Sequence, residues 1–177
     1  MATLISGSTG VNKITDGTIV NADIASGAAI AGTKLVMPTG SVLQVVEGNY
    51  STEVSTSSSS YVDIGLSASI TPISTSSKIF ITAGVSIMVY NNSAADAQAY
   101  LQMLRGSTEI ATKLVRLYDY GNSGTMLCVP AYIGRLDSPS TTSAVTYKIR
   151  MLLQEGAQVR AQYDGFTSNI VLMEIAG

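Results

Sequence analysis

Few residues in this chain are suited to catalysis, because the sequence contains no histidine. That absence removes the commonest general base, the Ser-His-Asp and Cys-His arrangements, and most zinc and iron sites. The remaining option is a pair of carboxylates that hydrolyses a glycosidic bond. The candidate acids are Asp119, Asp137, Glu155 and Asp164, and nothing in their spacing places two of them together. We therefore expect a protein that is not an enzyme, with no catalytic residue, metal ligand or cofactor.

One loop between two expected strands concentrates groups that could bind a sugar. It contains Tyr118, Asp119, Tyr120 and Asn122. Tyrosine rings can stack on sugar rings, and the carboxylate and the amide can bond to sugar hydroxyls. The segment 90–92, Tyr-Asn-Asn, is a second candidate. Glycan binding and a structural role stay open for both loops, because tyrosines at strand ends pack over neighbouring edges and asparagines serve turn backbones.

The single cysteine, Cys128, lies in the apolar run 126–130, MLCVP. Free cysteine is among the most buried residue types, so the run predicts a small buried hydrophobic residue rather than a reactive thiol. One cysteine cannot form a disulfide within the chain. We expect folding in a reducing cytoplasm, with stability from packing and assembly.

The chain after residue 40 shows strand periodicity. Segment 61–70 alternates strictly, with Val62, Ile64, Leu66, Ala68 and Ile70 on one face, which predicts a half-buried antiparallel strand. Segment 78–90 carries apolar residues on both faces. We expect it to be a central strand covered on one side by a second sheet and on the other by another subunit.

Further strands are expected near 42–46, 98–105, 109–118, 125–133, 144–153, 158–163 and 169–175. Turn residues separate them, as in the Asp164-Gly165 pair. About nine short strands without a convincing amphipathic helix predict an all-β fold, a jelly-roll-like antiparallel β-sandwich.

The N-terminal part has a different period. Its large aliphatic residues recur every five or six positions among small and polar residues: Ile14, Ile19, Ile24, Ile30 and Leu35. This spacing fits neither a helical face nor a strand. It favours an extended thread that cannot bury its aliphatic side chains alone and packs with copies of itself in a homotrimer. A flexible Gly/Ala-rich leader is the alternative, but such leaders have lower hydrophobicity and more charge.

A change of composition at residues 37–40, Met-Pro-Thr-Gly, marks a boundary between two parts. We expect an N-terminal extended attachment and trimerisation segment, 1–37, and a C-terminal β-sandwich head domain, 38–177. The hydroxyl-rich tract 51–60 is expected to be a loop within the head.

Composition narrows the classes of partner. Charged residues make up 12% of the chain, its net charge is −2, and 46% of its residues are apolar. Nucleic-acid binding needs a concentration of Lys and Arg that this sequence lacks. No apolar run approaches membrane-spanning length, and the first ten residues do not resemble a secretory signal. We expect no nucleic-acid partner and no membrane insertion.

Four segments together resemble the tail-fibre-like, short-fibre virion structural proteins of aquatic, cyanophage-like bacteriophages. Segments 55–81, 135–151 and 169–177 are similar to their distal domains, and segment 10–35 is similar to the sequences that precede such domains. The resemblance implies a homotrimeric fibre or spike on the exterior of the phage particle, synthesised in the host cytoplasm. Its N-terminal part would contact other virion proteins, and its β-domain would face outward.

The resemblance therefore implies a bacteriophage virion structural protein, a short trimeric fibre anchored by its N-terminus, and it leaves open whether the exposed head binds a host-surface glycan. This chain has almost no shaft, which leaves open a capsid decoration protein, a head fibre or a tail adaptor without receptor activity. A carbohydrate-active enzyme is the least favoured alternative.

Overall fold

The computed structural model describes residues 37–92, 96–118 and 124–177, which belong to one compact unit, Met37–Gly177. The elements in chain order are β1 (Val42–Tyr50), β2 (Val54–Thr56), β3 (Val62–Ile70), β4 (Lys78–Tyr90), β5 (Ala97–Arg105), β6 (Thr108–Leu117), β7 (Met126–Asp137), β8 (Val145–Glu155), β9 (Gln158–Ala161), a 3₁₀ turn η3 (Tyr163–Gly165) and β10 (Ser168–Ile175). The aliphatic residues of the predicted thread, Ile14, Ile19, Ile24, Ile30 and Leu35, lie outside the described residues, so the thread stays a prediction.

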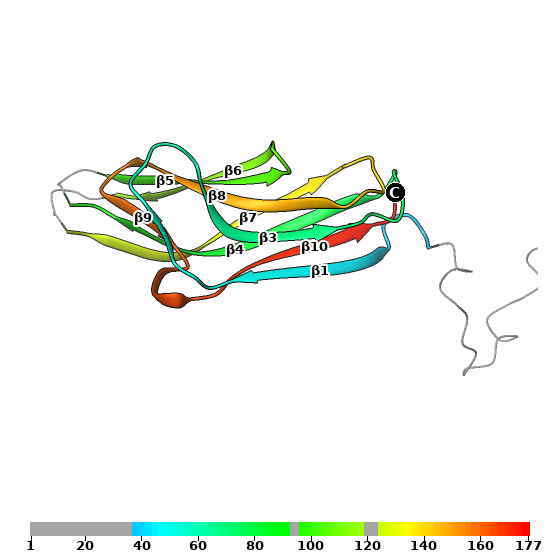
Figure 1. Ribbon diagram of the computed structural model, residues 1–177, viewed down its shortest axis with the longest axis horizontal. Coiled ribbons are helices and arrows are strands. Elements are labelled where there is room, and N and C mark those ends of the chain that lie inside the picture. The colour runs from blue at the N-terminus through cyan, green and yellow to red at the C-terminus, as the bar shows by residue number, and fades with distance from the viewer. Residues whose placement is uncertain (1–36, 93–95, 119–123) are drawn as a thin grey trace, which may run out of the picture. The chain divides into compact units, whose positions relative to one another are not determined.

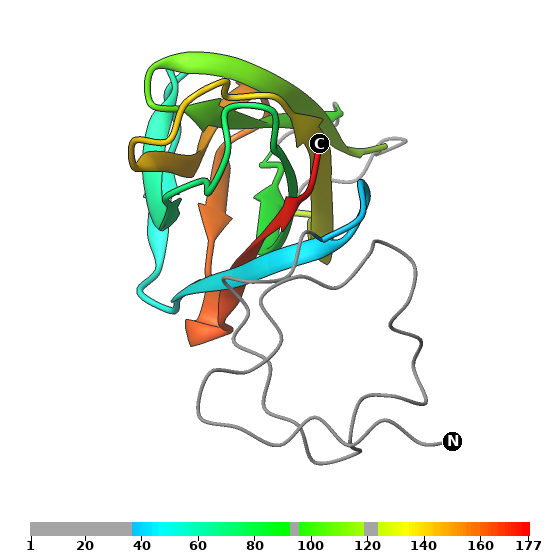
Figure 2. The ribbon, with the colours of Figure 1, turned by 90° about the vertical axis from the view of Figure 1, so that its right-hand side faces the viewer.

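The eight long strands form two antiparallel layers. One layer has the order β1-β10-β4-β7, and the other has the order β3-β8-β5-β6. Apart from the β5–β6 hairpin, every connection between consecutive long strands passes from one layer to the other, as in a jelly roll. Figures 1 and 2 show the layers, with β1 and β10 side by side in the first. The predicted jelly-roll-like sandwich is confirmed.

The core lies between the layers and follows the two-residue period of the strands. In β3, Ile64, Leu66 and Ile70 are at most 2% exposed, while the alternate residues face solvent. The inward residues of β4 are at most 1% exposed: Ile79, Ile81, Ala83, Val85, Ile87 and Val89. Burying each large apolar side chain contributes about 1.5–3 kcal/mol. These two strands therefore anchor the sandwich, as their periodicity predicts.

The described residues cover the outward face of β4 only in part. Met88 is buried on this face, whereas Phe80 is 41% exposed. The second sheet expected over one face is confirmed. The subunit expected over the other face stays a prediction.

The loop predicted over 51–60 is wrong at its centre. Val54–Thr56 forms β2, which pairs with β9 through Val54–Ala161 and Thr56–Val159. Val54 packs against the core, and threonine is enriched in strands. Three residues therefore extend the sheet although most of their neighbours are serines.

One edge of β4 is shared by two strands. β10 pairs with residues 78–84 of β4, and β9 pairs with residues 87–90. At Ser86, between these pairings, the backbone N–H donates to Ser168 Oγ (3.1 Å) and the carbonyl accepts from the Gln162 N–H (2.8 Å). The chain leaves the sheet between β9 and β10, and we call residues 162–167 the outer loop.

Candidate binding site

The outer loop is fixed by contacts at both ends of its turn. Gln162 is fully buried with a φ of 52°, and its Nε2 donates to Ser168 Oγ (3.0 Å). Asp164 has a φ of 56°, and its backbone N–H donates to Glu53 Oε2 (3.3 Å). Left-handed backbone is uncommon for residues other than glycine and persists only where the surroundings enforce it. These contacts set the positions of Tyr163 and Phe166 at the edge of the sheet.

The strand β7 presents a second set of side chains to the same place. Its inward residues Ala131 and Ile133 are buried, so the alternate residues Cys128, Pro130 and Tyr132 face outward. The prediction of a buried Cys128 is therefore wrong, because the thiol is exposed. A continuous apolar run does not reveal which of its alternating positions face the core.

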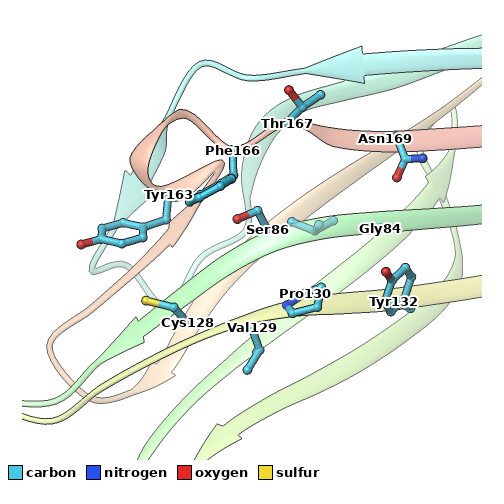
Figure 3. A pocket seen from close by; sticks show the side chains of 11 residues that line it. Gly84, Ser86, Cys128, Val129, Pro130, Tyr132, Tyr163, Phe166, Thr167 and Asn169 are labelled. Atoms are coloured by element: carbon cyan, nitrogen blue, oxygen red, sulfur yellow. The ribbon is translucent and has the colours of Figure 1, made fainter.

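A cavity of about 420 Å³ lies between the outer loop and the outward faces of β4, β7 and β10. Gly84, Ser86 and Pro130 form its floor, and Figure 3 shows Tyr132 and Phe166 at opposite sides of this floor. Tyr132 is 67% exposed and Phe166 is 63% exposed. Two aromatic rings therefore remain open to solvent beside a concave surface.

Gly84 brings an aromatic ring and a polar group together. A Cβ placed on this glycine would lie 2.9 Å from Asn169 Oδ1 and 3.1 Å from Tyr132 Cε1. The register explains this arrangement, because Asn169 and Tyr132 are the cross-strand neighbours of Gly84 on its two sides. Their side chains cover the space that a larger residue would fill, so glycine is required for both to lie across the floor.

The lining of the cavity is neutral and combines apolar with polar side chains. None of the eleven residues lining the cavity is Asp, Glu, Lys or Arg. Asp137 is paired elsewhere, accepting hydrogen bonds from Arg105 Nη1 (2.9 Å) and the Tyr147 hydroxyl (2.8 Å). Burial, followed by this hydrogen bond, raises the pKa of the Tyr147 hydroxyl. No group of three or more Cys, Asp or Glu residues in the described part of the chain could hold a metal ion.

The loop expected to bind glycans is described only at its first residue. Tyr118 is 60% exposed, and the guanidinium carbon of Arg116 lies 4.5 Å from the centre of its ring. Asp119, Tyr120 and Asn122 lie outside the described residues, so this site stays a prediction. At the second candidate, Asn91 is fully buried, and its backbone bonds to Thr125 and Gly124. Its position fits the structural alternative.

An apolar row crosses the outward face of the first layer near the start of β4. Register places Val45, Met173, Phe80 and Leu136 side by side on four adjacent strands. Val45 is 57% exposed, Phe80 is 41% exposed and Leu136 is 49% exposed. Phe80 precedes Gly84 by four positions, so the row lies about 13 Å along β4 from the cavity floor. The row and the cavity are separate features of one face.

The cavity residues were not predicted from the sequence, although one signal was available. Phe166 follows the turn residues Asp164 and Gly165 directly, and a large apolar residue at that position has no strand periodicity to place it in the core. Both phenylalanines of the chain, Phe80 and Phe166, are exposed. The pairing of Gly84 with Tyr132 depends on register across 48 positions, which local patterns do not reveal.

No protein-family model matches the chain, and no curated protein matches its sequence. Among solved structures, the structure of infectious bursal disease virus Gt strain aligns with this chain at 16% identity and a TM-score of 0.36; the alignment covers 85% of this chain and 42% of the viral chain. The structure of the infectious bursal disease virus VP2 subviral particle aligns at 17% identity and a TM-score of 0.38, covering 85% of this chain and 37% of the viral chain. The structure of dimeric latent PorU from Porphyromonas gingivalis aligns at 8% identity and a TM-score of 0.31, covering 79% of this chain and 14% of the PorU chain.

The chain spans less than half the length of these structures. At such TM-scores the superpositions do not establish a common fold. Within the described ranges, no helix has the length and apolar character needed to cross a membrane.

Proposed function

We propose that this chain is a structural protein of a bacteriophage virion, a short homotrimeric fibre or spike. Its N-terminal segment attaches it to other virion proteins, and its jelly-roll head faces outward and recognises a host-surface glycan. The resemblance to tail-fibre-like virion proteins motivates this proposal. A rigid sandwich without a catalytic constellation among the described residues is compatible with a structural and binding role.

The apolar row on the outward face is the observation that carries the assembly part of the proposal. Val45, Phe80 and Leu136 are large apolar residues in one continuous cross-strand row, and each is more than 40% exposed. Contiguous exposed apolar surface marks an interaction site. Copies of the same chain are the simplest partners, because most soluble oligomers are built from identical subunits.

Sedimentation velocity of the full chain at micromolar concentration tests this assembly. We expect a single species with the mass of three chains, because the exposed apolar row and the aliphatic residues of the thread both need partners. A stable, folded monomer across the concentration range would overturn the trimer and the interface together.

A further inference from the structure

We propose that the cavity beneath the outer loop binds a neutral hexopyranose, the ring unit of a neutral glycan. This inference rests on the proposed function and assigns its recognition step to a site distinct from the 118–122 loop. The charge, the shape and the free polar groups of the cavity lining match such a ring.

Charge restricts the ligand class. The lining contains no acidic or basic residue, so a phosphate, a carboxylate sugar or an amine would enter without a counter-charge. Burying an unpaired charge is costly. The cavity therefore suits a neutral ligand, and its volume of about 420 Å³ lies within the range of small-molecule sites.

The aromatic rings supply flat apolar surface at opposite sides of the floor. Tyr132 comes from β7, and Phe166 comes from the outer loop (Figure 3). Both rings are more than 60% exposed, so packing against other described residues leaves their faces largely open. A pyranose ring has an apolar face of C–H groups, which can stack on such rings while its hydroxyls point to polar neighbours.

Polar groups lie beside these rings and lack partners in the described part of the chain. No hydrogen bond there engages the side chain of Asn169, Ser86 or Thr167. Asn169 Oδ1 lies within 3 Å of the same point above Gly84 that the Tyr132 ring approaches. An aliphatic side chain from a protein partner would leave these groups unpaired as it desolvated them, whereas sugar hydroxyls can donate to and accept from them.

The site is preorganised. Gln162 and Asp164 hold left-handed backbone conformations that the contacts with Ser168 and Glu53 maintain. A loop already fixed in one conformation loses little entropy when a ligand binds.

Cys128 provides a built-in probe, because it is exposed in the cavity lining and is the only cysteine of the chain. The experiment measures its alkylation by N-ethylmaleimide in the full-length assembled protein. Methyl β-glucoside, methyl β-galactoside and methyl α-mannoside are titrated separately, and saturation-transfer NMR on the same samples detects binding directly. We expect at least one sugar to slow alkylation saturably, by roughly twofold when its concentration equals the dissociation constant.

Matched variants locate the binding. Tyr132→Ala and Phe166→Ala should each abolish the saturation-transfer signal at sugar concentrations that saturate the wild type. Tyr118→Ala should retain it, because Tyr118 is similarly exposed but does not line the cavity. Two cavity variants are used so that a folding defect in one leaves the test intact, and circular dichroism checks each fold.

Three results would overturn the inference. The first is no binding of any of the three sugars. The second is loss of binding in Tyr118→Ala with retention in Tyr132→Ala. The third is an unreactive Cys128 in the sugar-free assembly, which would mean that another copy covers the cavity. Sedimentation of the same samples separates the two proposals: a trimer that binds no sugar overturns the site alone, and a sugar-binding monomer overturns the assembly alone.

Discussion

Glu174 is a carboxylate buried at one end of the sandwich. It is fully inaccessible to solvent and accepts hydrogen bonds from Gln44 Nε2 (2.5 Å) and the Ile73 backbone N–H (2.7 Å). Burial acts to raise the pKa of Glu174, but the hydrogen bonds outweigh burial and lower it below the ordinary value of 4.5. The residue therefore ties β1, β10 and the 71–77 connection together as an anion.

Glu174 predicts a loss of stability in acid. Because the folded pKa lies below the unfolded value of 4.5, its stabilising contribution is complete above pH 4.5 and is lost as pH falls through the folded pKa. Glu174→Gln should remove this part of the pH dependence and lower the free energy of unfolding near pH 7 by about 1–2 kcal/mol. Urea denaturation at pH 7 and pH 3 measures both effects.

Glu47→Gln is the control, because Glu47 is exposed on the neighbouring strand β1, and it should change stability at pH 7 little. An unchanged slope of stability against pH in Glu174→Gln would contradict the role assigned to the buried carboxylate.

Individual residues differ in how far the sequence determines their surroundings. Ile64 and Leu66 are predictable as core because strict alternation with polar residues identifies the inward face. Cys128 is not, because Leu127 and Val129 beside it are also apolar and the pattern offers no polar reference. Its exposure follows from the pairing of β7 with β4, in which Cys128 lies opposite Met88. That pairing involves residues far apart in the chain.

At the scale of elements, β7 is an edge strand that contains a proline, Pro130. The backbone N–H and C=O of Ser86 bond to Ser168 and Gln162, on the side of β4 away from β7. Pro130 lies opposite Ser86 in β7. Because Ser86 directs no backbone group toward β7, the proline at this position costs no hydrogen bond to β4. The missing N–H of Pro130 therefore lies on the side of β7 away from β4, at the edge of the sheet, where proline discourages pairing with another chain. We therefore expect assembly through the face of this layer rather than through its β7 edge.

Two leucines test that expectation. Leu136 belongs to the apolar row and is 49% exposed, whereas Leu114 lies on β6 of the other layer and is 39% exposed. Leu136→Asp should weaken the trimer at least tenfold in its dissociation constant, about 1.4 kcal/mol, because it places a charge in an apolar interface. Leu114→Asp should leave association unchanged. Equal effects of the two substitutions in sedimentation would exclude the row as the interface.

The residue ranges of the strands were easier to predict than which strands lie next to one another. The period of two is local, and the strands β3, β4 and β8 lie close to their predicted ranges. The turn at Asp164 and Gly165 was expected, but the place of the outer loop beside the outward face of the sheet was not predictable, because it depends on how β9 and β10 share one edge of β4. That division depends on the register of residues 78–90 with two distant segments. The cavity residues therefore gather by topology rather than by motif.

At the scale of the whole molecule, the described residues of the unit Met37–Gly177 form a hydrophobic core of their own, as expected for a domain. Deleting residues 1–37 should leave a soluble β-domain with an unchanged far-ultraviolet circular dichroism signature. The same deletion should prevent incorporation into virions, which quantitative mass spectrometry of purified particles measures.

Full-length protein carrying Leu114→Asp is the matched control for incorporation, because its N-terminal segment is intact. Normal occupancy of the truncated protein in particles would show that residues 1–37 are not the anchor. An unfolded truncated protein would contradict the autonomy of the head.

The outer loop is joined to the sheet in a way that allows its length and sequence to change quickly during evolution. Both strands that flank it are registered against β4 independently, so a change of loop length between Tyr163 and Thr167 would shift neither register. The core would tolerate such variants, while the shape of one wall of the cavity would change with each. Specificity could then diversify between lineages faster than the fold, and the same position would accept a grafted peptide for display on an assembled particle.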